Sequence, residues 1–235
     1  MTDGWSESAA AWLADMGEKG DFARAFVLDR PMLARVSGRG FRTALDIGCG
    51  EGRFCRLLRG HGIAPIGVDP TEAFLDVARA RDPQGDYRLG RGEALPVEDS
   101  SVDLAVSYLS LIDMPDLDAA IAEMARVLKP GGTLLIANMT GFATANGMRG
   151  WLTDAAGQLD GFPIDHYLEE RAEWVGWRDV RIRNWHRPLS RYMSLLLGAG
   201  LTLRHFDEPA PHGGDPEKAE RYRRAPYFVI MEWRK

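Results

Sequence analysis

The sequence predicts an α/β fold in which seven strands form one doubly wound, mostly parallel sheet. Three observations support this fold class: apolar runs alternate with helical patterns up to residue 138, regular patterns return after residue 189, and a glycine-rich turn directly follows the first apolar run. Regular strand and helix alternation implies right-handed crossovers, which cover a parallel sheet on both faces. The chain has 235 residues, of which 45% are hydrophobic, so residues 1–235 are long enough to bury such a core as one domain.

The first half of the predicted sheet follows a cap of helices at residues 1–40. Asp21 is suited to be a helix N-cap in this cap, and Pro31 breaks the apolar pattern that follows it. Five short buried strands are then predicted at residues 42–47, 65–69, 87–89, 103–107 and 133–138. Apolar stripes predict helices between them, at Phe54, Leu57 and Leu58, at Phe74, Leu75 and Ala78, and at Ile121, Met124, Ala125 and Leu128.

The pattern changes near residue 139. Residues 139–188 hold many aromatic residues and are predicted to form a lid, which includes a hairpin between strands at 171–175 and 180–185. Residues 189–235 return to regular structure and complete the sheet, with a helix at 190–198, strands at 201–207 and 227–233, and a short charged helix after Asp215.

Composition and charge limit the classes of partner. The formal net charge is −5, so the protein as a whole does not attract phosphate groups. Nucleic acid is therefore not an expected partner. The two cysteines, Cys49 and Cys55, cannot assemble a four-ligand set, which predicts no metal site and a reducing compartment. No apolar run approaches the ~18 residues that span a bilayer, and the start carries acids where a secretory signal carries positive charge. A cytoplasmic protein without a membrane partner is expected.

The glycine-rich turn at residues 44–52, with the sequence ALDIGCGEG, lies where a doubly wound sheet binds ligands. Such sheets collect ligands at the carboxyl ends of their strands, where the winding reverses. Gly48 and Gly50 would let the main chain approach a ligand without an intervening Cβ, and Gly52 would let the helix close on the strand. The alternative for this segment alone is a tight turn that binds nothing.

A second acid, Asp69, ends the next predicted strand. A carboxylate there can accept both hydroxyls of a ribose and would repel a 2′-phosphate. A dinucleotide fingerprint starting at Gly48 would require glycine at position 53, where the chain has Arg53, so pyrophosphate is disfavoured. Asp46 and Glu51 place negative charge beside the turn, which suits a ligand with an ammonium and a sulfonium. One such contact at ~4 Å amounts to roughly 4 kcal/mol at an effective dielectric of ~20, before desolvation.

These residues resemble the class I S-adenosylmethionine-dependent methyltransferases, whose first motif reads acid-x-G-x-G-x-G, and in particular their UbiE-like small-molecule members. The resemblance covers most of the chain. It implies a Rossmann-like methyltransferase fold with residues 41–138 as the cofactor-binding half, and S-adenosylmethionine as the cofactor, with S-adenosylhomocysteine as its product. The matching motifs stand, in order, at residues 20–24, 45–52, 67–69, 93–96, 101–103, 126–132, 186–190, 199–201 and 208–209.

The resemblance also implies roles for single residues. Asp46 would hold the methionine amino group through water, and Asp69 would take the ribose diol. The other implied contacts are Gly48, Cys49 and Gly50 at the amino-acid part, Pro70 on one face of the adenine, and Gly92 and Glu93, whose main chain would meet the adenine edge. The family often has aspartate where this chain has Arg91, which cannot accept the adenine amino proton. A backbone carbonyl, another side chain or water is expected to do so instead.

Two further cofactor contacts have alternatives. Arg24 would pair with the methionine carboxylate, or would be a solvated arginine of a cap helix. Tyr108 follows the fourth strand and would face the methyl group, although a tyrosine at a strand end is equally often part of the core. Relatives often have His-Pro after the fifth strand, where this chain has Met139 and Thr140, so no role is transferred to that dipeptide.

Methyl transfer from a sulfonium is an in-line displacement whose donor is already activated. Alignment of nucleophile and methyl at ~3 Å can contribute ~7 to 11 kcal/mol, so the sequence requires no catalytic residue. The leading candidate is His186, which would act as base or orienter at the mouth of the pocket; the alternative is a structural histidine bonded to a loop carbonyl. His166 is a weaker candidate.

Seven large rings between residues 142 and 185 guide the choice of acceptor. Ring faces accept flat, apolar or cationic ligands, so a small organic acceptor, aromatic ones included, is predicted; the alternative is that the rings seal the lid onto the sheet. The predicted function is methyl transfer to an O, N or C nucleophile of this acceptor, by a monomer or homodimer. The competing functions are a catalytically silent S-adenosylmethionine-binding or interaction protein and, less favoured by net charge, an RNA methyltransferase.

Overall fold

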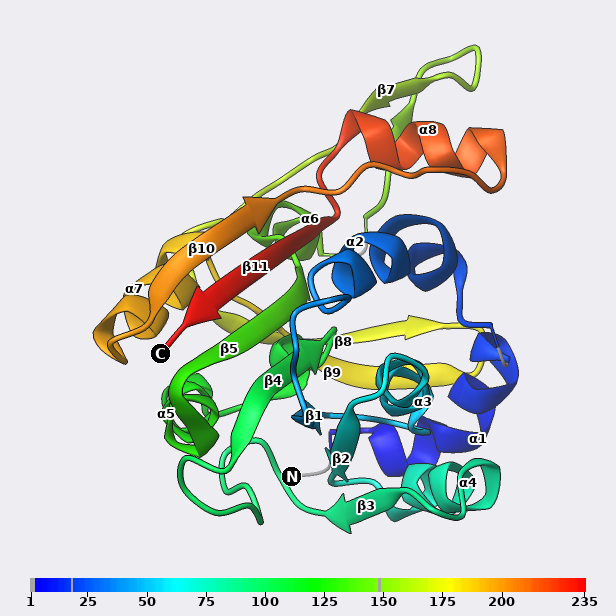
Figure 1. Ribbon diagram of the computed structural model, residues 1–235. Helices are drawn as coiled ribbons and strands as arrows, with labels where there is room; N and C mark the ends of the chain where they lie inside the picture. The colour runs from blue at the N-terminus through cyan, green and yellow to red at the C-terminus, as the bar shows by residue number, and fades with distance from the viewer. Residues whose placement is uncertain (1–2, 18, 148) are drawn as a thin grey trace.

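The computed structural model describes residues 3–17, 19–147 and 149–235. Residues 1, 2 and 18 of the predicted cap and residue 148 of the predicted lid lie outside the described residues. Figure 1 shows a twisted central sheet with helices on both sides. The strands of this sheet are β1 (Thr43–Ile47), β2 (Ala64–Asp69), β3 (Asp86–Leu89), β4 (Val102–Tyr108), β5 (Leu128–Met139), β10 (Thr202–Asp207) and β11 (Phe228–Arg234).

The helices match the predicted apolar stripes and the predicted N-terminal cap, and the short helix Gly141–Ala145 adds one that was not predicted. None of the described helices combines the length and the apolarity needed to cross a membrane. In chain order they are α1 (Trp5–Met16), the π-helical turn η1 (Arg24–Leu28), α2 (Asp29–Ala34), α3 (Arg53–Gly60), α4 (Glu72–Arg81), the 3-10 turn η2 (Leu111–Asp113), α5 (Leu117–Val127), α6 (Gly141–Ala145), α7 (Leu189–Gly198) and α8 (Pro216–Arg224).

The seven strands lie in the order β10-β11-β5-β4-β1-β2-β3. β1 pairs in parallel with β2 and with β4, β3 continues the sheet beside β2, and β5 continues it beside β4. β11 runs antiparallel to both β5 and β10. The predicted seven-stranded, mostly parallel sheet is therefore confirmed. Its winding reverses between β1 and β4, so ligands are expected at the carboxyl ends of these strands.

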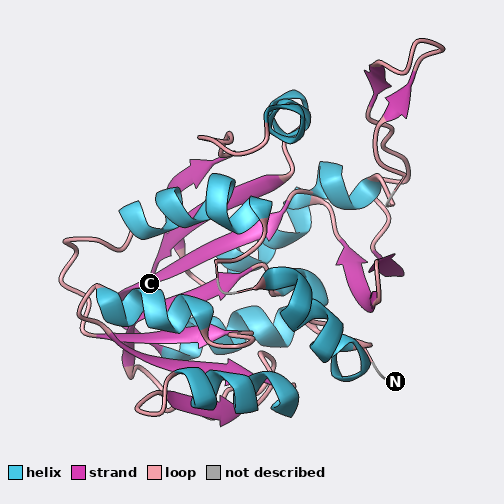
Figure 2. Cartoon of the chain, turned by 90° about the vertical axis from the view of Figure 1, so that its right-hand side faces the viewer, coloured by secondary structure: helices cyan, strands magenta, loops and turns pink. Residues whose placement is uncertain are grey.

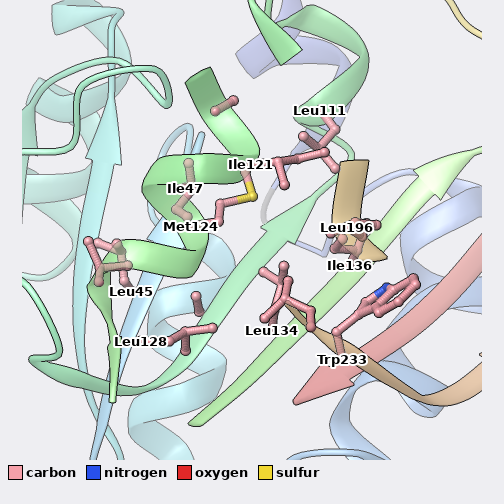
Figure 3. Close-up of a cluster of buried hydrophobic side chains, with 14 of the residues drawn as sticks. Leu45, Ile47, Leu111, Ile121, Met124, Leu128, Leu134, Ile136, Leu196 and Trp233 are labelled. Carbon is pink, nitrogen blue, oxygen red and sulfur yellow. The ribbon is translucent and has the colours of Figure 1, made fainter. Parts of the chain in front are cut away.

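Alternate residues of the central strands point to opposite faces and build two cores. Leu45 and Ile136 belong to the core under α5 and α7, which Figure 3 shows together with the fully buried Trp233 of β11. Ala44 and Leu104 belong to the opposite core, under η1, α2 and α3. Both faces of the sheet are thus covered, as the continuous apolar strands predict.

The predicted N-cap is confirmed, because Oδ1 of Asp21 accepts a hydrogen bond from the Arg24 amide at 2.9 Å. The expected break at Pro31 is wrong: the chain stays helical from η1 through α2, which contains Pro31. A π-helical turn changes the hydrogen-bond register just before the proline. The carbonyl of Phe26 accepts from the His212 amide at 2.9 Å, so it is satisfied from outside the helix. The helix can therefore hold a proline there.

The predicted hairpin in the lid is confirmed and extends further than expected, with β8 (Arg171–Trp177) paired to β9 (Val180–His186). It lies beside α1 in Figure 1. The two elements are joined by Ser8 Oγ, which donates to the Arg181 carbonyl and accepts from the Arg181 amide, each at 3.0 Å. A second hairpin that was not predicted, β6 (Leu152–Thr153) with β7 (Leu159–Gly161), projects from the body of the molecule in Figure 2.

Two neighbouring leucines of α7 test the packing of the first core. Leu196 is fully buried, whereas Leu197 is 55% exposed. Leu196→Ala should lower the free energy of unfolding by about 2–5 kcal/mol, because it removes buried carbons and leaves a cavity. The control Leu197→Ala should change it by no more than about 0.5 kcal/mol. Denaturant unfolding followed by circular dichroism measures both, and equal losses would contradict this packing.

Candidate functional site

The turn after β1 folds back onto the end of β2. The amides of Gly48 and Cys49 both donate to the Val68 carbonyl, at 2.8 and 3.0 Å. Gly48, Gly50 and Gly52 adopt positive φ angles of 76°, 53° and 77°. Side chains are strained in this conformation, so the backbone shape alone favours glycine at each position.

Protein atoms fill the space beside two of these glycines. A Cβ on Gly48 would lie 2.4 Å from Cβ of Ser110, and one on Gly52 would lie 2.6 Å from the Tyr87 hydroxyl. Gly52 was expected to let the helix close on the strand before it. The group that occupies the space beside Gly52 is instead the side chain of Tyr87 on β3. Gly50 has more room, since the nearest atom to its Cβ would be a Trp12 ring carbon at 3.5 Å.

Asp69 joins this turn to the end of β2. Its Oδ2 accepts from the Gly50 amide and its Oδ1 from the Thr71 amide, each at 2.8 Å. The side chain is 6% exposed, and burial raises the pKa of Asp69 to about 6. The Thr71 side chain is a third donor to this carboxylate. A carboxylate has about four lone-pair sites, so Asp69 can still accept a hydrogen bond from a ligand.

Asp46, near the end of β1, is 1% exposed. Its Oδ2 accepts a hydrogen bond from the Cys55 thiol at 3.4 Å, and its Oδ1 has no partner among the described residues. Burial, with a smaller contribution from the Asp69 carboxylate, raises the pKa of Asp46 to about 7. Buried carboxylate oxygens normally have a donor, so the position of Oδ1 points to one supplied by a ligand or by water.

A pocket of about 1000 Å³, counting the part open to solvent, covers these carboxylates at the switch point. We call it the first pocket. Oε1 of Glu93, in its wall, is a second buried oxygen without a partner among the described residues. The structure brings into this pocket all ten residues that sequence reasoning assigned to the cofactor: Arg24, Asp46, Gly48, Cys49, Gly50, Asp69, Pro70, Gly92, Glu93 and Tyr108.

The charge expected from Glu51 beside the turn is compensated within the protein. The Glu51 side chain is 2% exposed, and its Oε2 lies 2.6 Å from Arg56 Nη2 and 2.7 Å from Arg81 Nη1. These two arginines leave Asp46 and Asp69 as the acids of the turn that face a ligand without an arginine or lysine partner among the described residues.

A second pocket of about 1090 Å³, again counting open space, adjoins the first. Its walls come from α1, from the lid elements α6, β8 and β9, and from Tyr222 and Phe228 near the C-terminus. The residues that line both pockets mark the junction between them, and are Trp5, Trp12, Met16, Arg24, Leu109 and Asp113.

Of the seven rings on which the acceptor prediction rests, Trp177 is the one that lines the second pocket in the described part of the chain. Others pack elsewhere: Trp151 donates to the Tyr227 hydroxyl at 2.9 Å, and the ring of Phe162 lies 5.4 Å from that of Tyr227. These contacts favour the alternative, in which most of the rings seal the lid. The pocket instead takes its rings from Trp5, Trp12, Tyr222 and Phe228.

His186 lines the second pocket, but both of its ring nitrogens are hydrogen-bonded. Nδ1 lies 2.7 Å from the Thr144 hydroxyl and Nε2 lies 2.9 Å from the Tyr167 carbonyl. A carbonyl only accepts, so Nε2 carries the proton and Nδ1 accepts from Thr144. Burial lowers the pKa of His186, which favours the neutral ring. This geometry matches the structural alternative, and the catalytic role of His186 stays a prediction. His166 lies outside both pockets.

Tyr108 and Arg24 lie side by side in the wall of the first pocket. The Tyr108 hydroxyl donates to Asp29 at 2.8 Å, so its ring rather than its hydroxyl is available to a ligand. The Arg24 guanidinium lies 5.7 Å from the centre of that ring and 5.8 Å from the centre of the Trp12 ring, and Asp21 lies 3.2 Å away. Its pairing with a ligand carboxylate stays a prediction.

Sequence reasoning missed an aromatic wall formed by Trp5 and Trp12 of α1 with Phe74 of α4. The ring centres lie 6.0 Å apart for Trp5 and Trp12, and 4.9 Å apart for Trp12 and Phe74. The available signal was the two-turn spacing of the tryptophans, which places them on one helix face. Asp113 was missed as well, because nothing in its local sequence separates it from a solvated loop acid.

Comparison with known proteins agrees with this geometry. Residues 45–136 match a methyltransferase domain family. The malonyl-[acyl-carrier protein] O-methyltransferase of Salmonella typhimurium is 31% identical over 183 residues, which cover 74% of this chain and 70% of that protein. The chain belongs to the class I S-adenosylmethionine-dependent methyltransferases. The predicted family and its cofactor, S-adenosylmethionine, are thereby confirmed.

Other relatives extend the comparison. The solved S-adenosylmethionine-dependent methyltransferase of Mesorhizobium loti superposes with a TM-score of 0.77 at 26% identity, covering 93% of this chain and all of that one. The malonyl-[acyl-carrier protein] O-methyltransferase of Serratia marcescens is 36% identical over 146 residues, which cover 60% of this chain. The matched part spans 55% of the Serratia protein, about half its length.

The first pocket of this methyltransferase fits its cofactor. S-adenosylmethionine carries an ammonium and an adenine amino group, both of which donate hydrogen bonds. The pocket presents two buried carboxylate oxygens that lack protein partners among the described residues, on Asp46 and Glu93. Opposite charge nearby favours the ionised form of a carboxylate, so a cationic ligand offsets the burial of Asp46.

Asp69→Ala should weaken binding of S-adenosylmethionine by roughly 1–3 kcal/mol, because it removes an acceptor for the ligand and leaves the Gly50 and Thr71 amides unpaired. Isothermal titration calorimetry measures the change. The matched control is Asp76→Ala, at an exposed acid of the next helix that contacts Arg79 at 3.3 Å. Unchanged affinity in Asp69→Ala would contradict the role of this carboxylate.

Burial of Asp46 also predicts a pH dependence of stability in the ligand-free protein. Its pKa is about 7 in the folded state, above the usual 3.8, so the folded state holds a proton that the unfolded state releases. The resulting stabilisation is full below the unfolded pKa and is lost as the pH rises through 7. Between pH 8 and pH 5.5 the free energy of unfolding of the wild type should rise by about 2 kcal/mol relative to Asp46→Asn. Parallel pH series of denaturant unfolding measure this difference, and identical series would exclude it.

Proposed function

We propose that this protein transfers the methyl group of S-adenosylmethionine, bound in the first pocket, to a nucleophile of a small organic acceptor bound in the second. The observation that carries the proposal is the junction: two pockets of comparable size share a wall of side chains from α1, η1, η2 and the end of β4. A donor in one pocket and an acceptor in the other can meet there without passing through solvent.

Single residues of the first pocket would hold the cofactor. Asp46 would bind the methionine ammonium, directly or through water, and Asp69 would accept the ribose hydroxyls. Pro70 would cover one face of the adenine, and the main chain at Gly92 would meet its edge. Oε1 of Glu93 would be a buried acceptor for the adenine amino group. It would replace the aspartate that the family often has where this chain has Arg91.

The chemistry needs alignment more than a dedicated catalytic group. As the bond from the nucleophile to the methyl carbon forms, the bond from that carbon to sulfur breaks and sulfur keeps the electron pair, leaving a neutral thioether. Holding the two reactants in line can supply ~7 to 11 kcal/mol. Trp5 and Trp12 line the junction, Phe74 packs against them on the side of the first pocket, and β9 lines the second pocket. The lid role of residues 139–188 is part of this proposal.

The second pocket separates methyl transfer from a purely binding function. A protein that only retains S-adenosylmethionine requires no further cavity beside the donor, whereas a transferase requires space for its acceptor. Two of the relatives are malonyl-[acyl-carrier protein] O-methyltransferases, so a carrier-bound acceptor is the second candidate. We include three further properties in the proposal. The protein acts on its small acceptor in the cytoplasm, it is a monomer or homodimer, and it has no nucleic-acid or membrane partner.

Filling the second pocket tests this function. Ala143 lines that pocket and not the first, so Ala143→Phe should occupy acceptor space. With methyl-labelled S-adenosylmethionine and a small-metabolite extract, the wild type should label a product, and Ala143→Phe should lower the rate at least tenfold. Its affinity for S-adenosylhomocysteine should stay within threefold, which also shows that it folds. Binding of the donor without transfer to any small molecule by the wild type would reject the proposal.

A further inference from the structure

The second pocket has a distinctive charge. Four acids line it: Asp15, Asp21, Asp113 and Glu173. Arg24 is its one lysine or arginine among the described residues, and Arg24 already contacts Asp21 at 3.2 Å. Acids therefore outnumber cationic side chains in the lining, and the charge that an acceptor meets depends on how each acid is compensated.

Three of the four acids are compensated by arginines. Asp15 pairs with Arg178, Asp21 with Arg24, and Glu173 with Arg171. Asp113 differs, since none of the ion pairs between described residues includes it. Its hydrogen-bond donors are neutral, namely the Asn184 amide group and the Trp5 side chain.

Asp113 also lies where the reaction would take place. It ends η2, directly after β4, and it lines both pockets. The indole rings of Trp5 and Trp12 line the same junction, 6.0 Å apart and edge to face. A carboxylate beside aromatic faces is the combination that binds an ammonium group, through an ion pair and through cation–π attraction.

We propose that the acceptor is an amine with an apolar or aromatic body, and that Asp113 binds its ammonium group and takes one proton from it. This inference rests on the proposed function and names its substrate class. The ammonium gives a proton to the Asp113 carboxylate, and the nitrogen lone pair then forms the bond to the methyl carbon. The carbon–sulfur bond breaks with its electrons on sulfur, and the products are an N-methylammonium and a neutral thioether.

The surroundings of Asp113 suit a group that takes up a proton. Desolvation raises the pKa of Asp113 well above its usual range, and the Asp3 and Asp69 carboxylates add to this by repelling its ionised form. Arg24 lines the same junction, but it pairs with Asp21 at 3.2 Å. Arg187 lies below η2, but its guanidinium is directed to the carbonyls of Leu111, Met114 and Pro115. The Asn184 hydrogen bond opposes these effects in part by favouring the carboxylate.

A matched pair of probes tests the substrate class on the protein saturated with S-adenosylhomocysteine. Phenethylamine and 3-phenylpropanoate share a ring and a chain but carry opposite charges. Calorimetry should show the amine binding at least tenfold more tightly than the acid, and Asp113→Asn should reduce this preference at least fivefold. The control Asp118→Asn, an exposed acid on α5 that pairs with Arg191, should keep it. Equal or tighter binding of the acid to the wild type would overturn the inference.

Two further measurements distinguish this inference from two alternatives: a role of Asp113 toward the methyl donor, and an acceptor that is not an amine. If Asp113 served the donor sulfonium instead, Asp113→Asn would lose preference for S-adenosylmethionine over S-adenosylhomocysteine and keep its preference for the amine, which would reject the assignment. In the labelled-extract assay, the product should be a base-stable cation retained on a cation exchanger. Label in a base-labile ester would overturn the amine class and leave methyl transfer standing, whereas failure to bind S-adenosylhomocysteine would reject the proposed function itself.

Discussion

The hydrogen bond from the Gly50 amide to the Asp69 carboxylate links the two strands on which the site is built. β1 and β2 are adjacent and parallel, so their carboxyl ends meet at one edge of the sheet. The bond holds the glycine turn against the end of β2 while the Thr71 amide fixes the second carboxylate oxygen. One side chain thereby shapes the floor of the first pocket and presents acceptors to it. Its burial is tolerated because both oxygens are bonded to amides.

The roof of the site depends on contacts between distant parts of the chain. Ser8 on α1 forms two hydrogen bonds with Arg181 on β9, and Asp15 accepts a hydrogen bond from the Trp177 indole at 3.0 Å. These contacts join the N-terminal helix to the lid hairpin above the sheet. Neither element belongs to the central sheet: α1 lines both pockets, and the hairpin lines the second pocket. In the proposed arrangement, cofactor and acceptor therefore share the wall that α1 forms, and contacts between α1 and the hairpin also shape the space for the acceptor.

The cofactor half could be predicted from the sequence because its chemistry is local. Asp46, the glycine turn and Asp69 lie at strand ends whose positions follow from apolar runs, and parallel strands bring these ends together. The reason for Gly48 could not be predicted, because the Ser110 side chain that excludes a Cβ comes from the loop after β4. The second pocket had no local signature either. Its walls come from both ends of the chain and from the lid, and a count of aromatic residues could not show that the Trp151 indole is hydrogen-bonded to Tyr227 outside this pocket.

Charge at the junction constrains how the reaction can be accelerated. The sulfonium loses its positive charge as the methyl group leaves, so a fixed carboxylate beside sulfur would stabilise the donor more than the transition state and would raise the barrier. Asp46 and Asp69 avoid this by facing the amino-acid and ribose parts of the cofactor in the proposed arrangement. Asp113 lies at the junction itself and has no cationic side-chain partner among the described residues. Once it has taken a proton from the acceptor it is neutral, and the loss of charge on sulfur then carries no such penalty. Its desolvated position, which favours the protonated form, thus serves the transfer step as well as acceptor binding.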